Sequence, residues 1–98
     1  MKALLINNFE LKELEVDNTL EALQNQVGGY IEALTLVRNR AVMIVNEEGR
    51  LLHMTANLVA SAIAGHGIVG PALIVGVDGE EFTDVPEDVS RRIKIRFV

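Results

Sequence analysis

The sequence predicts an α+β fold, a single small domain with a mostly antiparallel sheet and two to three short helices. Three observations lead to this class. Short apolar runs separated by polar turns indicate strands joined as hairpins, and residues 30–54 hold three such runs in succession, which predicts a central three-stranded meander. Apolar residues at helical spacing interrupt the strand pattern. The length of 98 residues corresponds to one domain, residues 1–98.

The N-terminal part of the chain predicts two strands and a helix. The run KALLI at 2–6 is typical of a buried strand, and alternation over 13–16 predicts a second, short strand. Asn18 is the expected N-cap of a helix, with Glu21 at the capping-box spacing. The apolar stripe of this helix consists of Leu20, Leu23 and Val27.

Two consecutive glycines follow this helix, and each has a backbone role. We expect Gly28 to end the helix at a positive φ, where a side chain is disfavoured. Gly29 then lets the chain reverse into a strand without a Cβ clash.

The meander begins directly after the glycines. Strands at 30–37 and 41–45 form an antiparallel hairpin, and the second strand is apolar throughout, as expected for a strand covered on both faces. A turn at 46–49, in which Gly49 supplies a positive φ, leads to a return strand at 50–54.

The second half of the chain predicts a further helix and a buried strand. A helix at 55–65 is capped by Thr55 or Asn57 and ended by Gly65, and its small residues allow close packing on a sheet. The run ALIVGV at 72–77 is a buried strand.

The C-terminal segment predicts a short helix and then a strand. Pro86 is suited to the first turn of a helix. The run RIKIRF alternates between apolar and basic residues, which indicates a terminal strand near a sheet edge. Its basic face consists of Arg92, Lys94 and Arg96, which form either a solvated edge or a contact site for an anion or a partner.

Composition restricts the class of partner and the compartment. The net charge is −5 and the chain has no cysteine, so we expect neither general nucleic-acid binding nor disulfides nor cysteine chemistry. The N-terminal apolar run is too short for a signal peptide, and no run reaches the length of a membrane span. We therefore expect a cytoplasmic protein that does not enter membranes.

Catalytic and metal-binding patterns are weak. Neither serine lies in a nucleophile-elbow sequence, and the two histidines have no paired metal ligand at helical spacing. The adjacent acidic pairs are typical of solvated turns. Gly65, Gly67 and Gly70 match G-x-G-x-x-G, but this stretch follows a helix and precedes a strand, the reverse of a dinucleotide-binding fingerprint. We therefore expect no enzyme, no cofactor and no metal.

Two polar side chains remain as candidates for ligand binding. Glu32 lies within an apolar strand, where a carboxylate needs a partner or a solvated face, or else belongs to a pocket. His66 lies between two glycines, either as a solvated loop residue or presented to a ligand by a permissive backbone.

Several short stretches resemble one protein family. VGGYIE, NEEG and GPALIVGVDGE, in this order and spacing over about residues 1–83, resemble the small proteins catalogued as domain of unknown function 3846, which are common in phages and mobile elements of gut bacteria. The C-terminal VPEDVSRRIKIRF does not resemble that pattern, and Pro71 departs from it. The positions that match are Gly28, Gly29, Tyr30, Glu32, Glu47, Gly49, Asn57, Gly70 and Gly76.

The resemblance implies a virus-linked protein without an established activity. Most matched glycines have backbone explanations, whereas Tyr30, Glu32 and Asn57 do not, and we take these three as site candidates with Gly28, Gly29 and His66. Tyr30 either covers the core or stacks on a flat ligand beside the glycines.

These observations lead to two functional hypotheses. The first is a non-enzymatic binder of a small molecule, oligomeric, which sequesters a nucleotide-type signal in counter-defence. The second is an interaction module that inhibits a host protein through a sheet edge or the basic C-terminal strand. The apolar fraction of 49% favours burial between subunits.

Overall fold

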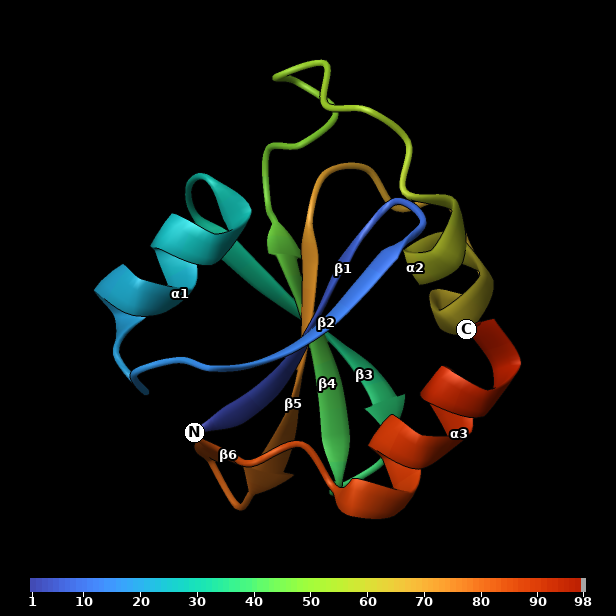
Figure 1. Ribbon diagram of the computed structural model, residues 1–98. Helices are drawn as coiled ribbons and strands as arrows, with labels where there is room; N and C mark the ends of the chain where they lie inside the picture. Colours follow the sequence, from blue (N-terminus) through green and yellow to red (C-terminus); the bar gives the residue numbers. More distant parts are fainter. Residues whose placement is uncertain (98) are drawn as a thin grey trace.

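A six-stranded antiparallel sheet forms the centre of the computed structural model, which describes residues 1–97 (Figure 1). Five strands follow the order β2-β1-β5-β4-β3, and β6 pairs with β5 beside this path. The strands are β1 (Lys2–Asn7), β2 (Glu10–Glu15), β3 (Ile31–Val37), β4 (Ala41–Asn46), β5 (Ala72–Asp78) and β6 (Glu81–Thr83). The helices are α1 (Leu20–Val27), α2 (Leu58–Ala64) and α3 (Glu87–Phe97). The α+β class predicted from the sequence is confirmed.

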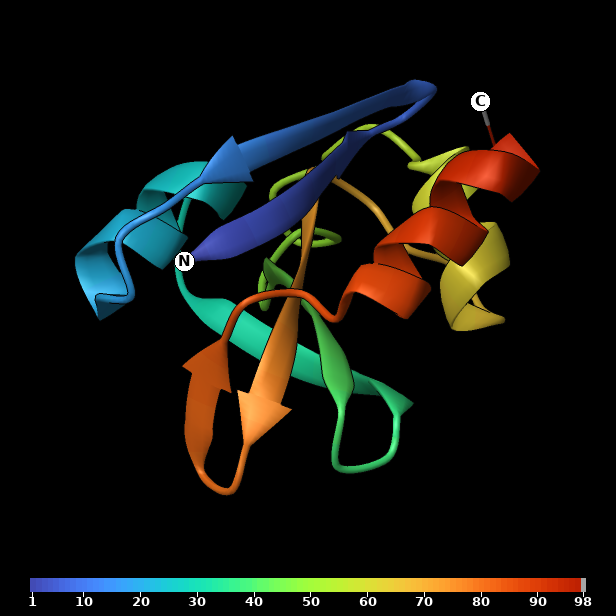
Figure 2. The ribbon, with the colours of Figure 1, turned by 60° about the horizontal axis from the view of Figure 1, so that its bottom comes forward.

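The sheet divides the core into two layers, and helices cover both of its faces. Helix α1 covers one face of the sheet, and α2 and α3 lie side by side over the other (Figures 1 and 2). Leu23 and Val27 of α1 pack on Ile44 and Leu73. On the other face, Ala60, Val89 and Ile93 pack in one cluster with Leu4, Met43 and Ile74. Strand β5 is apolar on both faces because helices cover both of them.

The first helix and its hairpin follow the sequence closely. Gly28 ends α1 at φ 84°, and β3 pairs with β4 in antiparallel register, as predicted. The N-cap is one residue later than predicted: the Thr19 hydroxyl accepts a hydrogen bond from the backbone N–H of Ala22 at 3.1 Å. The Asn18 side chain instead donates to the carbonyl of Phe82 at 2.8 Å.

The predicted return strand at 50–54 is wrong. Residues 47–54 form a loop of consecutive turns, closed by hydrogen bonds from Leu52 N–H to Glu48 O and from Met54 N–H to Gly49 O, each 3.0 Å. The second edge of β4 pairs with β5, so no position beside β4 is left for a return strand. The apolar pair Leu51 and Leu52 is consequently 77% and 55% exposed.

The prediction of positive φ at Gly49 is also wrong, and the glycine has a different reason. Its φ is not in the left-handed region. A Cβ at this position would lie 2.9 Å from Cγ2 of Val69, so the missing side chain lets two loops pack together.

The predicted C-terminal strand is wrong as well, because helix α3 continues through that segment. Val89, Ile93 and Phe97 recur every four residues and face the core, whereas Ile95 is 75% exposed. The alternating pattern therefore arises because an exposed isoleucine, Ile95, lies between two residues of the apolar stripe of a helix. Among residues 1–97, no helix combines the length and apolar character needed to cross a membrane.

Candidate functional site

A buried asparagine, Asn46, joins the end of β4 to the glycine pair. Its Nδ2 donates to the carbonyl of Val27 at 3.2 Å, and its Oδ1 accepts from the backbone N–H of Glu48 at 2.7 Å. A Cβ at Gly29 would lie 3.0 Å from Nδ2 of Asn46. The second glycine therefore leaves room for the close approach of this amide, and the junction joins the start of β3 to the start of the 47–54 loop.

Beside this junction lies a groove of about 220 Å³, which we call the loop groove. It is formed between β3, the 47–54 loop and the turn that follows α2. Its apolar side chains include Leu34, Val45 and Ile68, and its polar ones include Glu32, Glu47, Glu48, Arg50 and His66. Glu32 and His66 were predicted as separate candidates from the sequence, and in the structure both line this one groove.

Contacts between the two loops hold one wall of this groove in place. Nη2 of Arg50 donates to the carbonyl of Gly67 at 3.0 Å, which links the 47–54 loop to the turn that carries His66. Gly70, at φ 78°, leaves room for Met54, because a Cβ there would clash with the Met54 sulfur. The packing of the two loops therefore depends on glycines at two points of close approach, Gly49 against Val69 and Gly70 against Met54.

The charge on the loop groove is unbalanced. Three carboxylates, on Glu32, Glu47 and Glu48, face one guanidinium, on Arg50, with His66 near the same rim. Carboxylates accept hydrogen bonds strongly from amino and amide donors. The groove is thus suited to a ligand rich in N–H donors with little negative charge of its own.

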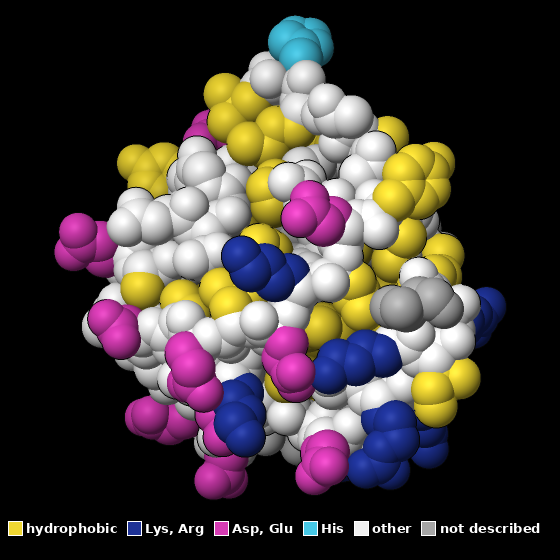
Figure 3. Space-filling view, in the orientation of Figure 1, with side chains coloured by type: hydrophobic (Ala, Val, Ile, Leu, Met, Phe, Trp, Pro, Cys, Tyr) yellow, Lys and Arg dark blue, Asp and Glu magenta, His cyan; other side chains and the backbone are white. Residues whose placement is uncertain are grey.

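Tyr30 lies on the surface next to this groove. Its side chain is 64% exposed, which excludes the alternative that it covers the core. It lines a shallow hollow of about 170 Å³ with Gly28, Gly29 and Leu52, and Glu48 borders both this hollow and the loop groove. Apolar side chains are also exposed near the 47–54 loop at the top of the molecule (Figure 3).

Asn57 does not belong to this site. It is the N-cap of α2 and is 1% exposed, with its Oδ1 accepting from Ala60 N–H at 3.1 Å. Its Nδ2 donates to the carbonyls of Ile6 and Gly70, each at 2.9 Å. Its amide therefore ties α2 to β1, which explains an asparagine at this position without a ligand.

The three basic candidates lie on α3 and do not line the loop groove. On a helix they no longer share one face, in contrast to the predicted strand. Nζ of Lys94 lies 3.0 Å from Oε2 of Glu13 on β2, whereas Arg92 and Arg96 border a hollow beside α2. Arg96 lies 5.5 Å from the ring centre of Phe97.

The sequence reasoning missed Asn46 and Arg50. The stretch NEEG predicted only a turn, and the predicted strand at 50–54 placed Arg50 in a sheet. A signal for Asn46 was present, because a polar residue directly after an apolar strand and close to paired glycines is well placed to satisfy backbone groups. Among residues 1–97, no three histidine, aspartate or glutamate side chains gather as metal ligands.

Comparisons with known proteins give one match. A family model described as a domain of unknown function matches residues 1–98. The match includes the C-terminal segment, which the resemblance noted above did not cover. No curated protein and no solved structure matches the chain.

Proposed function

The chain belongs to the family catalogued as domain of unknown function 3846, and from this premise we propose that it is a non-enzymatic binding protein with its ligand in the loop groove. The observation that carries the proposal is that Glu32 and His66, 34 positions apart in the chain, line one groove together with Arg50. We propose binding rather than turnover, with the carboxylates, the guanidinium and the imidazole of this groove as hydrogen-bonding groups.

The charges support a particular ligand class. A nucleobase offers amino and imino donors to carboxylates and acceptors to a guanidinium, all in one flat ring. A triphosphate would bring several negative charges next to Glu32, Glu47 and Glu48. We therefore propose a nucleoside-like or weakly charged nucleotide-type ligand, consistent with sequestration of a nucleotide signal in counter-defence.

The size of the groove supports a ligand that extends beyond it. At about 220 Å³ it is smaller than the 300–1,000 Å³ common for small-molecule sites. Glu48 separates the groove from the hollow at Tyr30, so a ligand that crosses Glu48 reaches the tyrosine ring. Stacking of a flat ring on Tyr30 would then add to the polar contacts of the groove.

Native mass spectrometry on protein from cells that are infected or that have an active defence system tests this function. We expect a bound small molecule whose ultraviolet absorbance resembles that of a nucleobase. The molecule should be absent from the Glu32→Gln variant and present in the Glu81→Gln variant, which carries its change on β6. A mass without bound ligand under all these conditions would contradict the proposal.

One observation favours a second candidate function, a protein-interaction module. Leu51 and Leu52 are exposed on a loop next to Tyr30, and exposed apolar and aromatic side chains in one place are typical of protein contacts. The basic C-terminal segment of this hypothesis is a helix and not a strand, so the contact surface under this candidate is the 47–54 loop or a sheet edge.

A further inference from the structure

One edge of the sheet, formed by β3, has no strand beside it in the described chain. β3 pairs only with β4. The carbonyl of Tyr30 accepts from Glu47 N–H at 2.8 Å, and in an antiparallel ladder the hydrogen-bonded pairs recur at every second residue. Glu32 and Leu34 therefore direct their backbone groups to β4, and Ile31, Ala33 and Thr35 direct theirs to the free edge.

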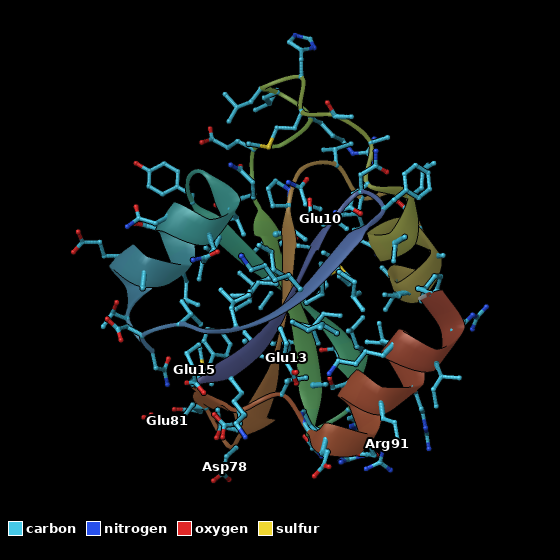
Figure 4. The ribbon with its side chains drawn as sticks, in the orientation of Figure 1. Glu10, Glu13, Glu15, Asp78, Glu81 and Arg91 are labelled. Atoms are coloured by element: carbon cyan, nitrogen blue, oxygen red, sulfur yellow. The ribbon has the colours of Figure 1, made fainter. Side chains whose placement is uncertain are left out.

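The opposite edge of the sheet is formed by β2, and its charged side chains protect it against pairing with another chain better than those of β3 do. β2 carries charges at four of its six positions, Glu10, Lys12, Glu13 and Glu15, and the three glutamates lie along the strand in Figure 4. β3 has seven residues and a single charge, Glu32. Charged side chains on an edge oppose pairing with another chain, so β2 is protected along its length. On β3 the ladder is irregular only near its end, between Thr35 and Val37, which leaves Ile31–Thr35 as a regular and weakly charged edge.

We propose that two copies of this chain pair through their β3 strands, antiparallel about a two-fold axis, so that the two sheets become one. This inference rests on the β3 edge and goes beyond the proposed function. Centred on Ala33, the pairing sets Ile31 of each copy opposite Thr35 of the other. Every outward-directed backbone group of these three residues then meets an outward-directed group of the partner.

The side chains on β3 fit a second copy. Ala33 and Thr35 are small and exposed, so a neighbouring strand can approach to the normal spacing. In this register Glu32 lies opposite Leu34 of the partner, and the two Glu32 side chains are diagonal rather than directly opposed. No like charges therefore face each other across the axis.

The loop groove supplies a reason for the second copy. Glu32 and Leu34 line the groove from β3, so the groove lies next to the free edge. A partner strand at that edge would extend the wall beyond these two residues and enlarge a site that is small in the single chain. The dimer would thus complete the binding site, with two grooves flanking one axis.

The net charge of −5 per chain sets the salt dependence of this association. Two acidic chains repel each other, and Glu32, Glu47 and Glu48 lie near the interface. Added salt screens this repulsion. We therefore expect the dimer to become tighter as the ionic strength rises, and Glu32→Gln to tighten it at low salt.

Sedimentation of the full chain over a concentration series tests the proposal, with Ala33→Pro as the disrupting variant. Proline at an outward-directed position removes an edge N–H but none of the bonds to β4. We expect a wild-type dimer at micromolar concentration and a dissociation constant raised by roughly tenfold or more in Ala33→Pro. The control is Glu13→Pro, at an outward-directed position on β2, because residues 1 and 16 form a hydrogen-bonded pair. This variant also removes the half-exposed ion pair with Lys94, and it should leave the dissociation constant of the dimer unchanged.

A wild-type chain that stays monomeric overturns the proposal. This holds even if the β3 edge is found to bind a segment of a different protein. An Ala33→Pro chain that associates like the wild type overturns it equally. Amide hydrogen exchange separates an unfolded variant from a dissociated one: Ile31 and Thr35 should lose protection on dissociation while Glu32 and Leu34 keep it. Titration of the monomeric Ala33→Pro chain with adenosine and guanosine shows separately whether the loop groove binds a nucleoside when no second copy is present.

Discussion

At the scale of single residues, Asn46 accounts for the local structure around the site. Its amide satisfies the last carbonyl of α1 and the N–H of Glu48 in the 47–54 loop, both beside the glycine pair. The glycines were explained from the sequence by φ and by chain reversal, and for Gly28 this is confirmed. The tight approach of Asn46 to Gly29 could not be predicted, because it joins residues 17 apart along the chain through a side chain.

Asn46→Ala should destabilise the protein. It leaves the buried Val27 carbonyl and the partly buried Glu48 N–H without their partner, and an unsatisfied buried group costs about 1–3 kcal/mol. Urea denaturation measures the free energy of unfolding. Asn25→Ala, on the exposed side of α1, is the control and should change it little. Equal stability of the two variants would contradict this role for Asn46.

Tyr30→Ala should leave the fold nearly unchanged, because the ring is exposed. If the ring stacks on a flat ligand, binding should weaken by about 1–3 kcal/mol, whereas Tyr30→Phe retains the stacking surface and loses little. The melting temperature and a ligand titration of both variants measure the two effects. A large drop in melting temperature for alanine would indicate a structural role instead.

At the scale of elements, two apolar or alternating runs were assigned to strands and are not strands. RLLHM has the composition of a strand, but β5 occupies the edge of β4 that it would need. RIKIRF alternates, but it also continues the four-residue spacing of Val89. Local pattern could not decide either case, since the competition between segments for a sheet position is settled by long-range packing.

The junction between α3 and the β3–β4 turn provides a pH-dependent element. Arg40 donates two hydrogen bonds to Asp88, at 2.8 and 2.6 Å. This hydrogen bonding to Arg40 lowers the pKa of Asp88 from its usual 3.8 to about 2. A lowered pKa in the folded state means that the stabilisation is fully present above the ordinary value and is lost as the pH falls through about 2.

The stability advantage of the wild type over Asp88→Asn should therefore be present near neutral pH and shrink below about pH 4. Urea midpoints of both proteins between about pH 6 and pH 2 measure this difference. Glu87→Gln is the control, because its pair with Arg91 is longer, at 3.3 Å, and more exposed than the pair of Arg40 with Asp88. A difference that grows towards acid pH would contradict the assignment.

At the scale of the whole molecule, the sequence predicted the class, the β3–β4 hairpin and the helix ends at Gly28 and Gly65. It also selected Glu32 and His66, but it could not show that they share a groove, because that depends on how the turn after α2 packs against the 47–54 loop. The same limit applies to the sheet order. Which strand has a free edge follows only from the assembled sheet, and the proposed dimer rests on it.

The central claim is that the loop groove binds a donor-rich, weakly charged ligand. Isothermal titration with adenosine, guanosine, their monophosphates and their triphosphates tests it most directly. We expect at least one nucleoside or monophosphate to bind more tightly than its triphosphate, with affinity reduced by about tenfold in Glu32→Gln and unchanged in Glu81→Gln. Tighter binding of every triphosphate, or equal affinity in Glu32→Gln and the wild type, would contradict the claim.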